Sequence, residues 1–82
     1  MDDIEKARIA VVVFLKKALG VNDLKIIKIA KYEGGWEAEA EVYEASTFIR
    51  SLGLPARLQD RNIYAVKMGD NLEIQSYELV KT

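Results

Sequence analysis

The sequence predicts an α+β fold, with an N-terminal helix packed on an antiparallel sheet of two hairpins (about four strands) and a short connecting helix. Three observations lead to this fold class. Apolar residues recur at helical spacing from Ile4 to Ala18, residues 36–42 alternate strictly between apolar and acidic, and two later β-rich runs flank a Gly-Asp-Asn turn. A helix with one apolar stripe and a sheet with one apolar face bury both by packing together.

Length and composition favour one folded unit. The chain has 82 residues, and we expect a single domain over residues 1–82. Hydrophobic residues make up 50% and charged residues 30%, which allows a core inside a solvated surface. A formal net charge of -1 offers no basic field for nucleic acid, so no nucleic-acid partner is expected.

The expected location is the cytoplasm, with no membrane association. The longest apolar run, residues 9–15, is far shorter than the roughly 20 residues of a membrane-spanning helix. The start of the chain is acidic, whereas the first part of a secretory signal is basic.

The side-chain inventory argues against catalysis. The chain contains neither cysteine nor histidine, the residues that most often serve as nucleophile, general base or transition-metal ligand. Gly34-Gly35 lacks the remaining residues of a phosphate-binding loop. Glu44 and Asp60 would form an acid–base pair only if folding brought them together. The chain is therefore expected not to be an enzyme and to need no cofactor or metal.

The first predicted element is a helix that Asp2 or Asp3 caps and Gly20 ends. Its core stripe consists of Ile4, Ala7, Val11, Phe14, Leu15 and Ala18. Ile9 and Val13 fall on the opposite face. They are either scattered surface residues or a docking patch for a partner or for a second copy in a weak homodimer.

A hairpin follows, with a first strand from Leu24 to Tyr32 and a two-residue turn at Gly34-Gly35. Its register matches apolar residues on one face and opposite charges on the other. The expected pairs are Ile29 with Ala40, Ile27 with Val42, and Lys28 with Glu41.

Three glutamates, Glu37, Glu39 and Glu41, share the polar face of the second strand. Three carboxylates on one face could bind a cation, but a hard-cation site usually also contains loop carbonyl ligands and ligands that converge on one point. A solvated face that pairs with lysines such as Lys28 is the preferred interpretation. Together with Tyr43, this face is a second candidate surface for partner binding.

The second half of the chain is predicted to form a short helix, Thr47 to Leu52 with Ser46 as cap, and then a second hairpin. Its strands cover about Ile63 to Met68 and Leu72 to Val80. A three-residue turn, Gly69-Asp70-Asn71, joins them with Asn71 left-handed. The apolar pattern changes parity near Ser76, which either a β-bulge or burial on both sides of the strand would explain.

Residues spread from Gly34 to Tyr77 also form a pattern of their own. They are Gly35-Trp36, Glu41-Val42-Tyr43-Glu44, Pro55, Asp60, Tyr64-Ala65-Val66, Gly69-Asp70-Asn71-Leu72 and Tyr77. In order and spacing this pattern resembles the gas vesicle protein O family, small accessory proteins encoded with the gas vesicle genes of archaea and bacteria. This sequence has a longer stretch from Ser46 to Leu54 and no arginine-rich tail after Tyr77.

The resemblance implies a cytoplasmic, non-enzymatic factor for gas vesicle formation that acts through protein–protein binding during assembly. Its implied partners are other gas vesicle accessory proteins or unassembled shell protein. The alternative from another class is a generic peptide-binding or inhibitory module on the same one-helix antiparallel-sheet scaffold. An enzyme that uses carboxylates alone would need a deep polar pocket joining Glu44 and Asp60.

Overall fold

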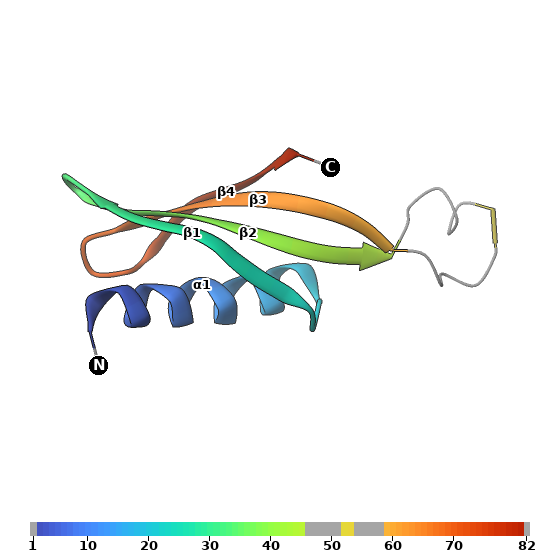
Figure 1. Cartoon of the computed structure of the whole chain (residues 1–82), viewed down its shortest axis with the longest axis horizontal. Coiled ribbons are helices and arrows are strands. Elements are labelled where there is room, and N and C mark those ends of the chain that lie inside the picture. The colour runs from blue at the N-terminus through green and yellow to red at the C-terminus, as the bar shows by residue number, and fades with distance from the viewer. Residues whose placement is uncertain (1, 46–51, 54–58, 82) are drawn as a thin grey trace.

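The computed structural model describes residues 2–45, 52–53 and 59–81. It contains one helix and four strands, in the order α1 (Asp3–Leu19), β1 (Leu24–Tyr32), β2 (Gly35–Ala45), β3 (Gln59–Gly69) and β4 (Ile74–Lys81). The strands form one antiparallel sheet in the order β1-β2-β3-β4, and α1 lies on one face of it (Figure 1). The predicted α+β fold is confirmed. The body of the predicted connecting helix, residues 47–51, lies outside the described residues.

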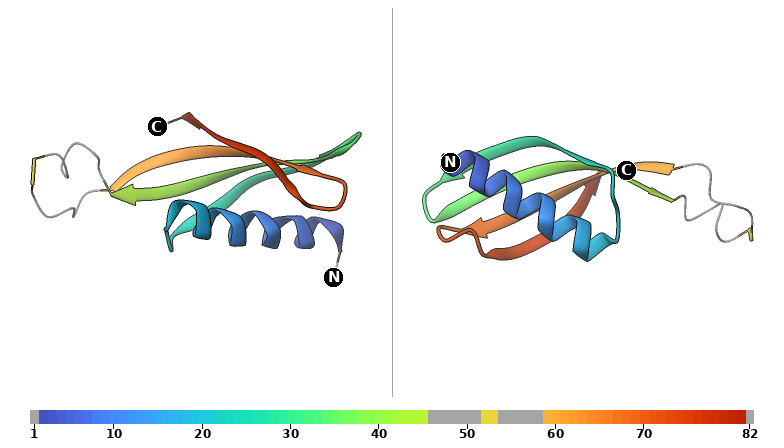
Figure 2. Two further views of the ribbon diagram at one scale, coloured as in Figure 1. Left: turned by 180° about the vertical axis from the view of Figure 1, so that it is seen from behind. Right: turned by 90° about the horizontal axis from the view of Figure 1, so that it is seen from below.

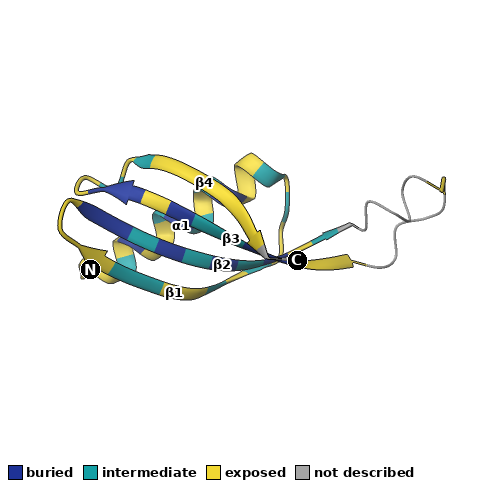
Figure 3. Cartoon of the chain, turned by 90° about the horizontal axis from the view of Figure 1, so that it is seen from above, coloured by how far each residue is buried: buried dark blue, intermediate teal, exposed yellow. Residues whose placement is uncertain are grey.

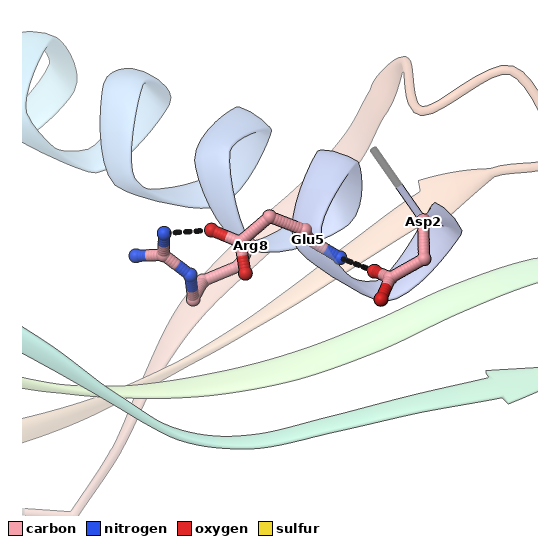
Figure 4. A network of polar contacts seen from close by, with 3 residues as sticks. All are labelled: Asp2, Glu5 and Arg8. Atoms are coloured by element: carbon pink, nitrogen blue, oxygen red, sulfur yellow. Dashed lines mark hydrogen bonds and ion pairs between the residues drawn. The ribbon is translucent and has the colours of Figure 1, made fainter.

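Helix α1 begins and ends where its capping residues predict. The Asp2 carboxylate accepts a hydrogen bond from the backbone N–H of Glu5 at 2.8 Å, and Glu5 forms an ion pair with Arg8 one turn on (Figure 4). At the other end Gly20 adopts a left-handed conformation (φ 66°) and donates its N–H to the Lys16 carbonyl at 3.0 Å. These bonds satisfy backbone groups that a helix end leaves without partners.

The core lies between α1 and the even-numbered residues of β2. Its fully or almost fully buried members are Ala7, Val11, Leu15, Trp36, Ala38, Ala40, Val42, Val66 and Met68. Two residues of the predicted stripe, Ile4 and Ala18, are exposed instead. The straight helix crosses the twisted sheet at an angle (Figure 2), so only its middle turns lie close against the strands.

The turn of the first hairpin differs from the predicted one. Its two loop residues are Glu33 and Gly34, and the register pairs Tyr32 with Gly35. Gly34 supplies the positive φ (96°) that such a turn requires. Gly35 belongs to β2, where a Cβ atom would lie 2.0 Å from the Met68 carbonyl oxygen of β3. The second glycine therefore serves close strand packing and not the turn.

This register is two residues away from the expected one, and a β-bulge at Ile27 changes it further. A shift of two residues keeps every side chain on its face, so Ile29 still faces the helix and pairs with Ala38. The bulge then turns Ile26 inward opposite Ala40 and leaves Ile27 44% exposed. Two adjacent isoleucines cannot both face inward in a regular strand, and the bulge resolves the conflict.

The loop of the second hairpin has the predicted length of three residues, but it begins one residue later in the chain than predicted. Gly69 donates its N–H to the Glu73 carbonyl at 3.0 Å, and the loop between them is Asp70, Asn71 and Leu72. The left-handed residue is Leu72 (φ 66°), and not Asn71 as expected. The Leu72 side chain packs against the core, which offsets the cost of this conformation.

Strand β4 contains the bulge predicted near Ser76. Met68 pairs with Ile74 and Lys67 pairs with Ser76, so Gln75 is the extra residue. The bulge brings Tyr77 to the helix side of the sheet, where its ring meets Phe14 edge-on at 5.0 Å between centroids. Strand β3 begins at Gln59, four residues before the expected start.

Candidate protein-binding surfaces

The first predicted surface, on the outer side of α1, is exposed to solvent. Ile9 is 38% exposed and Val13 60% exposed, while Ala7, Val11 and Leu15 on the other side are buried. Residues four apart on a helix are neighbours, so the two side chains lie next to each other. We name this pair the helix patch.

The second predicted surface is the side of the sheet that α1 does not cover. Glu37 of β2 lies opposite Lys67 of β3, and Glu39 and Glu41 lie opposite lysines of β1. Lys28 lies opposite Glu39, whereas the expected register placed it opposite Glu41. Cross-strand pairs of opposite charge stabilise an open sheet face modestly. We name Glu37, Glu39, Glu41 and Tyr43 the glutamate face.

Within the glutamate face, Glu41 is the residue with specific side-chain partners. Its carboxylate accepts hydrogen bonds from the Tyr43 hydroxyl and from Arg61 Nε, the latter at 2.7 Å. These bonds, that of Tyr43 first and that of Arg61 second, lower the pKa of Glu41 below its ordinary value. The bond to Glu41 also raises the pKa of Tyr43. The fold therefore joins Glu41 to Tyr43, whereas Glu37 and Glu39 stand apart along the strand.

Metal binding finds no geometric support in the residues with described positions. Among them, no three Asp or Glu side chains come together in a group that would hold an ion. The glutamates follow one another along β2 and do not converge on a common point, as ligands of a hard cation do.

A polar cluster that was not predicted lies on the helix side of the sheet and joins the last part of β2 to the first part of β3. In Figure 1 these two strands extend past the end of α1. Glu44 Oε1 accepts two hydrogen bonds, from Asn62 Nδ2 at 2.7 Å and from the Tyr64 hydroxyl at 2.8 Å. Burial, followed by the bond to Glu44, raises the pKa of Tyr64 to about 12. The signal in the sequence is parity, because residue 44 continues the buried face of residues 36 to 42.

The same cluster shows how the carboxylates Glu44 and Asp60, the candidate acid–base pair, lie in the folded chain. They are direct cross-strand partners, so folding does bring them together. Asp60 is exposed, however, and Glu44 Oε1 is occupied by two donors from β3. The arrangement joins β2 to β3 through Glu44, and among the described residues it brings no nucleophile or third catalytic group to the carboxylates.

A third surface, which is apolar and was also not predicted, follows the edge strand β4. Tyr77 is 44% exposed, and Leu79 and Val80 are each 48% exposed. Figure 3 shows that β4 is exposed along most of its length, whereas β2, in the interior of the sheet, alternates between buried and half-buried residues. The Tyr77 ring also lies 6.4 Å from that of Tyr64, which connects this edge to the polar cluster.

Comparison with known proteins does not assign the chain to a family. No protein-family model, curated protein or solved structure matches it. In the part of the chain that the structure describes, no helix is long and apolar enough to cross a membrane.

Proposed function

We propose that this protein is a cytoplasmic, non-enzymatic accessory factor for gas vesicle formation that acts by binding other proteins during assembly. Its partners would be other gas vesicle accessory proteins or unassembled shell protein. The observation that carries the proposal is that residues of the resemblance, distant in the sequence, contact one another in the folded sheet.

The contacts run from one hairpin to the other. Gly35 admits the Met68 carbonyl of β3, and the Trp36 side chain beside it is only 3% exposed. Glu44 of β2 accepts the hydrogen bond of Tyr64 in β3, and the Tyr64 ring neighbours that of Tyr77 in β4. The order and spacing of these residues therefore meet the requirements of one sheet, which supports their interpretation as a single pattern.

A binding role fits the surfaces better than a catalytic one. The helix patch is apolar and solvent-exposed, and the glutamate face carries negative charges that lie opposite lysines of the neighbouring strands, with Tyr43 at its end. Mixed apolar and charged surfaces of this kind are common at modest protein–protein interfaces. Each surface is held by regular secondary structure, so a partner would meet it largely preformed.

Capture of partners tests the proposal directly. The full chain, immobilised through an added terminal tag, would be incubated with each protein encoded in a gas vesicle gene cluster, produced separately. We expect at least one accessory or shell protein to be retained. Retention of none of them, with a folded bait, would contradict the proposal.

Paired variants then locate the surface. Ile9→Glu with Val13→Lys changes the helix patch, and the matched control introduces the same two charges at exposed residues, as Asn22→Glu with Asn71→Lys. Both proteins should stay folded, because exposed substitutions usually cost little. If the helix patch binds the partner, the first variant loses retention and vesicle formation while the control keeps both.

The glutamate face is tested in the same way. Glu39→Lys with Glu41→Lys reverses two charges of this face, and Glu33→Lys with Asp70→Lys reverses two exposed charges in the hairpin turns. If only the first variant loses the partner, the glutamate face is the docking surface. Normal retention by this variant and by the helix-patch variant would exclude both surfaces.

A generic peptide-binding or inhibitory module is the second candidate, and the exposed apolar edge of β4 favours it. Such modules often bind an extended peptide along a sheet edge. Retention of unrelated extended peptides, with no preference for vesicle proteins, would support this candidate over the first.

A further inference from the structure

The two edges of the sheet differ in how they are protected against pairing with another strand. On β1, three exposed lysines (Lys25, Lys28 and Lys31) follow the edge, and a bulge interrupts it at Ile27. Charged side chains, lysine above all, together with bulges are the usual protection of an edge strand. The β1 edge is therefore poorly suited to receive a further strand.

Strand β4 lacks this charge protection. Its regular stretch, Ser76 to Leu79, lies between two shifts in the register with β3 and contains Glu78 as its one charged residue. Tyr77 and Leu79 project from this stretch on the helix side, opposite Val66 and Tyr64 of β3, yet both remain nearly half exposed. Within the described residues, no strand lies beyond β4.

We propose that β4 pairs in antiparallel fashion with β4 of a second copy of this chain, so that two sheets join into one continuous sheet. A twofold axis perpendicular to the sheet relates the copies, which places both helices on the same face. Antiparallel pairing also satisfies backbone N–H and C=O groups that an edge strand otherwise directs to water.

The residues of β4 select the register. Pairing centred on Tyr77 sets the two tyrosines opposite each other on the helix side and sets Glu78 opposite Ser76 of the other copy. Pairing centred on Glu78 would set two glutamates directly opposite, which is destabilising. The register centred on Tyr77 avoids like charges and adds an aromatic pair, so β4 is complementary to itself.

The size of this contact predicts a reversible dimer. The bulges at both ends limit regular pairing, and in the register centred on Tyr77 it covers the three residues Ser76 to Glu78, because Leu79 would lie opposite the bulge residue Gln75. A contact of this length buries much less surface than a permanent interface does. We therefore expect monomer and dimer to exchange, with the dimer favoured at high protein concentration.

Disulfide crosslinking tests the register, because the natural chain has no cysteine. In the proposed register residues 76 and 78 of different copies face each other at about 4.5–5.5 Å between Cα atoms, within disulfide range. A mixture of Ser76→Cys chains and Glu78→Cys chains should thus form mixed dimers on mild oxidation. The chain Ser76→Cys alone keeps Glu78 and should give far less dimer, and efficient dimerisation of it alone would contradict the register.

Sedimentation equilibrium tests the interface without a crosslink. The parent chain should shift from monomer toward dimer as its concentration rises, and Tyr77→Lys should weaken the association at least tenfold. Ile27→Lys is the matched control, because Ile27 has the same exposure, 44%, on the opposite edge, and it should associate as the parent does.

Circular dichroism would show whether Tyr77→Lys still folds, since Tyr77 contacts Phe14. If it does not fold, the crosslinking of residues 76 and 78 decides alone, because both are exposed and lie on the face away from the helix. A parent chain that stays monomeric at millimolar concentration and gives no mixed crosslink would overturn the proposal. Association lost in Ile27→Lys and kept in Tyr77→Lys would overturn it as well.

Discussion

The two faces of β2 carry residues of the same strand in opposite environments. On the helix side, Trp36, Ala38, Ala40 and Val42 are at most 3% exposed. On the other side, three glutamates lie opposite lysines and stay in contact with water. The same strand therefore contributes to stability by packing on one face, while its other face is held by cross-strand charge pairs in contact with water.

Loss of Trp36 is expected to have the largest effect on this comparison. Trp36→Ala removes a buried aromatic side chain and should lower the free energy of unfolding by about 3–5 kcal/mol. This is a large share of the roughly 5–15 kcal/mol of a small domain. Glu39→Ala, on the opposite face of the same strand, should change it by only about 0.5 kcal/mol. Urea unfolding measures both, and equal effects would show that the faces do not differ as described.

Loss of the hydrogen bond between Tyr64 and Glu44, on the helix side of the sheet, should lower stability by a smaller amount. Tyr64→Phe keeps the ring and removes the hydroxyl that donates to Glu44, so stability at neutral pH should fall by about 1 kcal/mol. The same variant leaves Glu44 with the Asn62 bond. Thermal unfolding of the two proteins side by side measures the difference, and an unchanged or higher melting temperature would contradict the role of the bond.

The raised pKa of Tyr64 predicts a pH dependence of this contribution. The folded protein holds the hydroxyl neutral up to a pKa of about 12, against 10.0 for an ordinary tyrosine. The contribution is therefore complete below pH 10 and is lost as the pH rises through about 12. Alkaline unfolding should be less steep in Tyr64→Phe than in the parent. Ultraviolet absorbance should show one late-titrating tyrosine fewer in the variant than in the parent.

On the glutamate face, the expected effect is a change in titration. The lowered pKa of Glu41 means that its contribution is present above its ordinary pKa of 4.5 and is lost as the pH falls through the lower folded value. Tyr43→Phe and Arg61→Gln should each return the pKa of Glu41 toward 4.5, because each removes one of the hydrogen bonds that lower it. Carboxyl chemical shifts measured by NMR would report the pKa of Glu41. An unchanged pKa in both variants would show that the two hydrogen bonds do not lower it.

The smallest expected effect is none. If the glutamate face is solvated and paired with lysines, calcium, magnesium, a chelator or ATP should leave the melting temperature unchanged. A clear rise with calcium alone would show that the glutamates gather a cation, and it would make the outer face a ligand site. Glu39→Gln with Glu41→Gln should then abolish the rise.

Local sequence patterns were enough to predict the elements and most of their faces. Capping residues and periodicity predicted the bounds of α1, strict alternation predicted β2, and the parity change predicted the bulge near Ser76. These signals are local, because a cap, a period or a turn glycine acts within a few residues. The exposure of Ile9 and Val13 followed from the same helical geometry.

Three features were not predicted and arise from tertiary packing: the register of the first hairpin, the bulge at Ile27 and the left-handed Leu72. Each depends on which neighbour a residue meets. Gly35 lies in β2 because the Met68 carbonyl of β3 approaches it, and Leu72 adopts its conformation because the core holds its side chain. The bond between Glu44 and Tyr64 likewise joins residues 20 positions apart. Such choices follow from the packing of distant segments, whose relative placement no local pattern contains.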